Sequence, residues 1–179
     1  MYYTTRYESM IGSMVLASDG SKLVGLWNEG QKYFAATLDG DSAERPELSI
    51  FADTKNWLDA YFAGEKPVLF DVPLAPSGSA FRQAVWEKLC EIPYGTCVTY
   101  GSIAKELSRG MNKKSMSSQA VGGAVGHNPI SVIIPCHRVV GGNNSLTGYA
   151  GGIDKKIKLL AHEGVDTAQF FIPTKGTAL

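Results

Sequence analysis

The 179-residue sequence has few cysteines, no excess of charge of either sign and no long apolar run. Its 17 basic residues balance its 17 acidic residues, which argues against a protein that coats nucleic acid through overall positive charge. No window approaches the roughly 18 consecutive apolar residues of a membrane span, and the N-terminal residues lack the apolar core of a signal peptide. We therefore expect a cytoplasmic protein without a membrane partner.

The three cysteines, Cys90, Cys97 and Cys136, cannot all pair within one chain, and none forms a C-x-x-C motif. Count and spacing therefore exclude a disulfide framework and a cysteine-based zinc site. A functional cysteine must then act as a free thiol. We interpret Cys90 and Cys97 as buried structural residues, because cysteine is among the most buried residue types.

The first part of the chain predicts strands followed by one helix. Three short runs rich in Tyr, Thr, Val and Leu are typical of strands: residues 2–7, 13–17 and 23–27. Asp19-Gly20 has hairpin-turn chemistry, and a polar loop is expected near residues 38–46. Apolar residues then recur at helical spacing until Gly64 ends the helix. They are Phe51, Leu58, Tyr61 and Phe62.

A stretch rich in proline divides the chain, and the part beyond it predicts mainly helices. Pro73 and Pro76 precede Ser77-Gly78-Ser79, so we expect one domain over residues 1–76 and another over residues 77–179. Capping residues and apolar periodicity then predict four helices, which begin near Ser79, Thr99, Ser117 and Ile153. The second and third suggest a helix-turn-helix, although their connection is longer than the usual three or four residues.

Basic side chains gather between residues 100 and 126, where the only acid is Glu106. They are Lys105, Arg109, Lys113 and Lys114. Such a segment docks on phosphate in nucleic-acid-binding proteins, and it is equally typical of a solvated charged face. The residues alone leave both interpretations open.

The third of these helices has one face with almost no side chains. Gln119, Gly122, Gly123 and Gly126 share it because they follow i, i+3, i+4, i+7 spacing. Each interior glycine costs about 1 kcal/mol relative to alanine, so the face needs an offsetting reason. One reason is close packing against another helix. The other is close approach to DNA, whose minor groove is only about 6 Å wide. Taken alone, the pattern favours packing.

A Cys-His-Arg triplet lies inside the apolar run from residue 132 to residue 140. Buried polar groups are costly unless they are paired, so the run predicts a functional site with Cys136 as nucleophile. A thiol with a pKa near about 8.5 needs a base at neutral pH, and His137 is the adjacent candidate. Glu163 ends the last helix against its dipole, which makes it a candidate to orient His137. The glycine-rich residues 141–152 either expose backbone to a planar ligand or form a loose surface loop.

Four motifs follow one another in the second half of the chain: Gly126-His-Asn-Pro129, Ile134-Pro-Cys-His-Arg-Val139, Thr147-Gly-Tyr-Ala-Gly-Gly152 and Leu159-Leu-Ala-His-Glu-Gly164. In this order they resemble the O6-alkylguanine-DNA alkyltransferases, the methylated-DNA–protein-cysteine methyltransferases. The resemblance is densest over residues 81–164 and weaker over residues 56–63. It implies an N-terminal ribonuclease-H-like α/β domain. It also implies a mainly helical C-terminal domain whose helix-turn-helix enters the minor groove of double-stranded DNA.

The same resemblance implies direct-reversal DNA repair in a single turnover. The damaged base flips out of the duplex, and Cys136 takes the alkyl group of O6-alkylguanine, or of O4-alkylthymine, as a thioether. His137 would remove the thiol proton through a water, and Glu163 would orient His137. Asn128 would brace the turn before the cysteine segment, and Tyr100 would assist protonation of the departing guanine. No cofactor is required, and a monomer is expected.

The family pattern also assigns binding residues. The carbonyls of Cys136 and Val139 would read the exocyclic amine of the base. Tyr149 and the Ala150 N–H would complete the pocket around O6, and Gly151 would also bind the substrate. Contacts with DNA would come from Gly122, Gly123 and Arg138.

The sequence departs from the family pattern at the recognition helix. Gln119 stands where the family usually has an arginine that fills the gap left by the flipped base, so we expect weaker DNA binding and less efficient flipping. The connection over residues 108–116 is longer than the family pattern, and its Lys113 and Lys114 would supply phosphate contacts that partly offset this loss. No cysteine precedes Cys90 and all three histidines lie in the C-terminal half, so the structural zinc of some members is excluded.

Two other classes of function remain open at this point. A DNA-damage recognition or regulatory protein would flip alkylated bases without repairing them. Its known relatives replace the cysteine, so Cys136 argues against this class, whereas Gln119 is compatible with it. A Cys-His hydrolase would need an oxyanion hole and repeated turnover.

Overall fold

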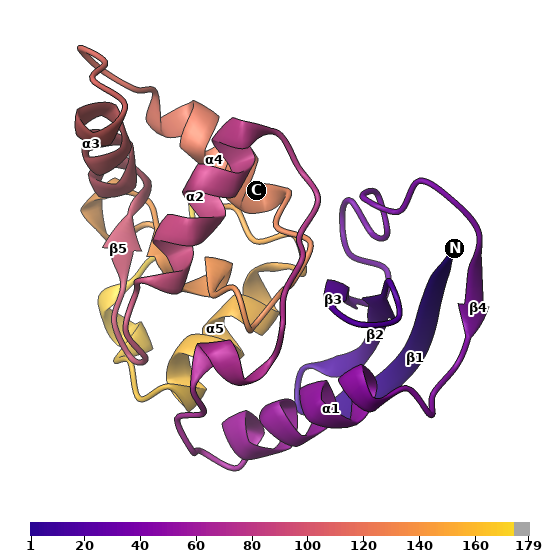
Figure 1. The fold of residues 1–179 in the computed structure, drawn as a ribbon. Helices are drawn as coiled ribbons and strands as arrows, with labels where there is room; N and C mark the ends of the chain where they lie inside the picture. Colours follow the sequence, from indigo (N-terminus) through magenta and orange to yellow (C-terminus); the bar gives the residue numbers. More distant parts are fainter. Residues whose placement is uncertain (174–179) are drawn as a thin grey trace. The chain divides into compact units, whose positions relative to one another are not determined.

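The computed structural model describes residues 1–173 and divides into two units (Figure 1). The first unit comprises Met1–Gly78 together with Pro129–Ile133, and the second comprises Ser79–Asn128 and the chain from Ile134 onward. The predicted architecture, an N-terminal sheet domain followed by a mainly helical domain, is confirmed. The return of Pro129–Ile133 to the first unit was not indicated by the sequence.

The first unit contains a four-stranded sheet in the order β3-β2-β1-β4. Its three long strands form where the sequence predicts them: β1 (Tyr2–Ser9), β2 (Gly12–Ser18) and β3 (Leu23–Asn28). The Asp19 carboxylate accepts the N–H groups of Ser21 and Lys22 at 2.9 and 2.8 Å, and this forms the turn between β2 and β3.

A short strand, β4 (Ser42–Glu44), corrects one expectation. Residues 38–46 were predicted to be a polar loop, but β4 pairs in parallel with β1. All three of its residues are exposed, so the partner strand rather than an apolar pattern creates it.

The helix α1 (Ser49–Phe62) packs against β1, β2 and β3. Phe51, Leu58 and Tyr61 are buried on its inner face, as their spacing predicts. On β3, the indole of Trp27 lies over Gly25, and a Cβ added at Gly25 would lie 1.8 Å from the ring atom Cη2. A glycine at this position therefore makes room for the largest side chain of the sheet core.

The second unit is built from four helices: α2 (Ala80–Cys90), α3 (Tyr100–Gly110), α4 (Ser118–Gly126) and α5 (Ile153–His162). The predicted caps are confirmed. Ser79 accepts the Arg82 N–H, Thr99 forms a capping box with Ser102, and Ser117 caps α4. The helices α2, α3 and α4 pack against one another, and the buried Trp86 of α2 donates from Nε1 to the Ala124 carbonyl of α4 at 2.9 Å.

A two-stranded parallel sheet lies beside these helices. It joins β5 (Val98–Thr99) to β6 (Val139–Val140), and neither strand was predicted. Short 3-10 turns complete the fold: η1 (Leu69–Asp71), η2 (Cys136–Arg138), η3 (Gly142–Asn144) and η4 (Thr167–Gln169). Because β6 directly follows η2, its pairing with β5 holds the chain immediately after the predicted nucleophile.

No helix within residues 1–173 is long and apolar enough to cross a membrane. The same part of the chain contains no group of three or more His, Cys, Asp and Glu side chains that could hold a metal ion.

We expect Gly25→Ala to destabilise the protein by about 1–3 kcal/mol, because the added methyl group must displace the Trp27 ring from a filled core. Urea unfolding followed by tryptophan fluorescence measures the change. Gly40→Ala is the control, since a Cβ there meets no atom within 4 Å. Equal stability of the two variants would contradict the packing described for β3.

Candidate active site

The chain leading to Cys136 is held by tight turns. One turn is centred on Val132, a buried β-branched residue with a left-handed φ of 71°, a costly conformation for such a side chain. The second is an inverse γ-turn at Pro135 (φ −82°, ψ 63°), in which the Cys136 N–H donates to the Ile134 carbonyl at 2.8 Å. The Asn128 side chain donates to the same carbonyl at 2.8 Å. Cys136 itself is 5% exposed.

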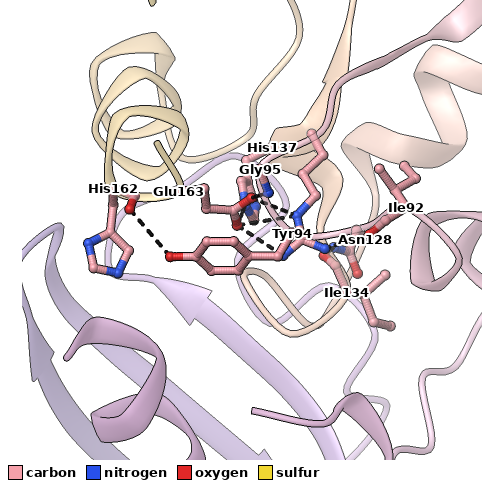
Figure 2. A network of polar contacts seen from close by, with 9 residues as sticks. Ile92, Tyr94, Gly95, Asn128, Ile134, His137, His162 and Glu163 are labelled. Atoms are coloured by element: carbon pink, nitrogen blue, oxygen red, sulfur yellow. Dashed lines mark hydrogen bonds and ion pairs between the residues drawn. The ribbon is translucent and has the colours of Figure 1, made fainter. Parts of the chain in front are cut away.

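His137 is fully buried and lies 2.7 Å from Glu163, measured from Nε2 to Oε1 (Figure 2). A carboxylate only accepts hydrogen bonds, so Nε2 carries the proton and Nδ1 is the basic nitrogen. Nδ1 is buried and has no hydrogen-bond partner within residues 1–173. Burial lowers the pKa of His137 despite the opposing effect of Glu163, so the imidazole is neutral at rest. The free lone pair is therefore available to take a proton.

The Glu163 carboxylate accepts hydrogen bonds from His137 and two other residues (Figure 2). Arg138 donates to it from Nε at 2.9 Å and from Nη2 at 3.0 Å, and the Gly95 N–H donates at 2.9 Å. Burial alone raises the pKa of Glu163, but the hydrogen bonds from His137 and Arg138 outweigh burial and hold it well below its usual range. Glu163 is thus an anion in a buried position, at the C-cap of α5.

Glycine is required at position 95 for two reasons. Its φ is 72°, and an added Cβ would lie 2.8 Å from the Glu163 carbonyl oxygen.

Arg138 continues the network, since its Nη1 donates to the Ile92 carbonyl at 2.7 Å. Its guanidinium is thereby occupied, and this geometry favours a structural role for Arg138 over the predicted DNA contact.

The Cys136 thiol is protonated at rest. Burial raises its pKa, whereas a hydrogen bond with the Asn128 side chain and the charge of Lys156 act in the opposite direction. A thiolate therefore forms only when a base removes the proton. The neutral His137 supplies such a base from the neighbouring position.

Lys156 is a site residue that sequence reasoning missed. It is fully buried on α5, and its ammonium donates to the Val139 carbonyl and, at 2.8 Å, to the Thr147 carbonyl. Burial lowers its pKa to about 8. One signal was present in the sequence, because Lys156 interrupts the apolar stripe of α5 three residues after Ile153 and four before Leu160.

The Tyr100 hydroxyl and the Lys156 ammonium donate to the same carbonyl, that of Thr147. The Tyr100 hydroxyl donates to it at 3.0 Å, and the Lys156 ammonium lies 6.0 Å from the Tyr100 ring centre. Burial raises the pKa of Tyr100. Gly148 permits this approach, since its φ is 69° and an added Cβ would lie 2.8 Å from the Tyr100 hydroxyl oxygen. The structure thus joins Tyr100 to the chain that leads into Tyr149.

The predicted pocket residues differ in exposure. Val139 is fully buried and Tyr149 is 8% exposed, while Ala150 and Gly151 are half-buried. Their contacts with a base remain predictions.

The glycine face of α4 is open. Gln119 and Gly123 are exposed, and a Cβ added at Gly123 or Gly126 would meet no atom within 4 Å. A Cβ at Gly122 would make only an ordinary contact, 3.8 Å from the Tyr100 ring. The packing explanation, which the sequence alone favoured, is therefore wrong for Gly123 and Gly126. Lys113 and Lys114 are exposed in the connection before α4.

Comparison with known proteins identifies the family. The model of the 6-O-methylguanine DNA methyltransferase ribonuclease-like domain matches residues 1–76, and the model of the DNA-binding domain of the same family matches residues 80–165. A methylated-DNA–protein-cysteine methyltransferase of Methanosarcina acetivorans is 45% identical over 169 residues, which cover 92% of this chain and 99% of the relative. A relative of the same name from Haemophilus influenzae is 39% identical over 91% of this chain and 87% of its own length.

A solved structure agrees with these matches. It is the crystal structure of Mycobacterium tuberculosis OGT in complex with DNA, which is 40% identical, covers 94% of each chain and has a TM-score of 0.76. The two family models together span nearly all of the described residues. The chain therefore belongs to the 6-O-methylguanine DNA methyltransferase family.

Proposed function

We propose that the protein repairs DNA by transferring the alkyl group of O6-alkylguanine, and of O4-alkylthymine, to Cys136. The observation that carries this proposal is the state of His137. Its Nε2–H is held by the buried Glu163 anion, so its Nδ1, which has no partner among the described residues, is a base in the residue that follows the buried Cys136. A buried nucleophile with an oriented base fits a group-transfer reaction. The relatives named methylated-DNA–protein-cysteine methyltransferases support the same activity.

The reaction balances with the residues present. The Cys136 proton passes to Nδ1 of His137, by way of a water, and the sulfur attacks the alkyl carbon. The bond between that carbon and O6 breaks, its electron pair stays on the guanine, and the guanine takes the proton of the Tyr100 hydroxyl. Solvent then reprotonates Tyr100, and the His137 imidazolium releases its proton to solvent. The product is a thioether on Cys136. A thioether has no activated bond for water to attack, so each molecule reacts once.

Lys156 supports this step through charge and position. Its ammonium opposes the rise in the Cys136 pKa caused by burial, and so stabilises the thiolate that forms during attack. It also holds the carbonyls of Val139 and Thr147 in place. We assign to Lys156 the role of a positioning and charge-stabilising residue.

The DNA-binding surface lies on the second unit. We assign α3 and α4 as a helix-turn-helix, with α4 presenting its open glycine face to the minor groove of double-stranded DNA. Gln119 is exposed on that face and is the candidate to fill the gap of the flipped base. We assign a ribonuclease-H-like fold to residues 1–76, which match the ribonuclease-like domain of the family, and a single copy of the chain carries all of these elements.

Intact-mass measurement tests the proposal. Incubation with duplex DNA that contains O6-methylguanine should add one methyl group to the protein, and peptide mapping should locate it on Cys136. Cys97→Ala should react like the wild type, and Cys136→Ser should not react. An unchanged mass would indicate recognition without repair, and more product than protein would indicate hydrolysis. Either result would overturn the proposal.

We expect Lys156→Met to slow the reaction at pH 7 by about tenfold, since a neighbouring charge is worth on the order of one pKa unit of thiolate stabilisation. Lys156 is charged below its pKa of about 8 and loses its proton above it, so the deficit should shrink as the pH rises past 8. Rate profiles from pH 6 to 9.5 check this, with the exposed Lys158→Met as control. Rates that fall by one constant factor at every pH would contradict the charge role.

We expect Gln119→Arg to strengthen binding to duplex DNA and to raise the reaction rate on duplex substrate by about fivefold, because arginine adds a charge and a longer reach at the open face of α4. Its rate with the free base O6-benzylguanine should stay at the wild-type value. Unchanged kinetics on the duplex would show that glutamine fills the gap equally well.

A further inference from the structure

The surface around the end of α3 is basic and has no acidic partners. Glu106 lies 4.0 Å from Lys88, which also pairs with Glu91 at 2.7 Å. After Glu106 the sequence has no acidic residue until Asp154. The cations of this region are all exposed, and none forms an ion pair with any residue that the structure describes: Lys105, Arg109, Lys113 and Lys114.

The end of α3 fixes the backbone positions of three of these cations. Lys105 and Arg109 are four residues apart, so they lie on one face of α3 and about 6 Å apart along its axis. Asn112 then adopts a left-handed φ of 52°. The Lys113 N–H turns back and donates to the Ser108 carbonyl at 2.8 Å, and the Asn112 N–H donates to the Arg109 carbonyl at 3.2 Å.

This pair of hydrogen bonds is a Schellman cap, and it fixes the backbone of Lys113 but not that of Lys114. The backbone of Lys113 is tied to the last turn of α3, whereas Lys114 lies one residue beyond the cap. Lys113 therefore has a fixed backbone position at the end of the helix that carries Lys105 and Arg109. We call these three residues the α3 ridge.

We propose that the α3 ridge binds the phosphate backbone of the DNA duplex beside the minor groove, and that Asn112 is the positioning residue that presents Lys113 to it. The proposal rests on the proposed function, in which α4 approaches duplex DNA. Each strand of the duplex carries one negative charge per about 3.4 Å of its axis, so Lys105 and Arg109, about 6 Å apart along α3, together with Lys113 beyond the helix end, can meet several phosphates. The ridge thus supplies charge that Gln119 does not.

Uncharged substitutions at Asn112 change how the backbone holds Lys113 without changing the charge of the α3 ridge. Asn112→Val should release Lys113, because a β-branched residue disfavours a left-handed φ, whereas Asn112→Gly adopts it freely. We expect Asn112→Val to weaken duplex binding about threefold to fivefold and to lower the salt dependence of the affinity, and Asn112→Gly to bind like the wild type. Equal affinity of the two variants would overturn the role of Asn112.

Charge variants test the ridge itself. The slope of log Kd against log salt concentration should fall by about 0.9 for each of Lys105→Ala, Arg109→Ala and Lys113→Ala. Lys158→Ala removes an exposed lysine of α5, which lies at the other end of the second unit (Figure 1), and should leave the slope unchanged. Wild-type slopes for all three ridge variants would overturn the proposal.

Transfer from free O6-benzylguanine keeps this test distinct from that of the proposed function. Every ridge variant should alkylate Cys136 with this small substrate at the wild-type rate, which also shows that the variants are folded. If the wild type itself gains no methyl group from duplex DNA that contains O6-methylguanine, the proposed function fails. If all proteins react and every ridge variant has the salt slope of the wild type, only the proposed role of the α3 ridge is wrong.

Discussion

The buried Glu163 carboxylate is the constraint on which the rest of the active site depends. It stays charged out of water because His137, Arg138 and the Gly95 N–H all donate to it. Loss of one donor would leave a buried charge partly uncompensated, which costs far more than the loss of an ion pair at the surface. Since the donors come from η2 and from the turn after α2, one carboxylate fixes the end of α5 against both segments.

This arrangement also sets the protonation states at rest. Burial raises the pKa of Cys136 and lowers the pKa of His137, so the resting pair is a thiol and a neutral imidazole. A stable thiolate would react with any electrophile that reached it, whereas this thiol ionises only as its proton passes to Nδ1. For a protein proposed to react once, a low resting reactivity protects the nucleophile until a correctly placed alkyl group arrives. The positive charge of Lys156 opposes the rise in the Cys136 pKa and so favours the thiolate as it forms, while the thiol stays protonated at rest.

The sequence predicted those features whose signals are local. Capping hydroxyls marked the starts of three helices correctly, at Ser79, Thr99 and Ser117. The short strands were missed because their partners are distant in sequence, as with Val98 and Val139, and two residues carry no periodicity. Lys156 was missed for a similar reason, since its burial depends on carbonyls contributed by other segments. Likewise, the glycine pattern of α4 could not distinguish a packed face from an open one.

The first unit has none of the predicted catalytic residues, yet it holds the chain that leads to Cys136. Residues 129–133 exchange two backbone hydrogen bonds of 2.8 Å with Leu26 and so extend the sheet along the edge strand β3. Within this segment, Val132 keeps a left-handed backbone that a buried β-branched residue adopts only when its surroundings impose it. The nucleophile follows three residues after the segment ends. The hydrogen bonds of β3 therefore fix the backbone of residues 129–131 within the first unit.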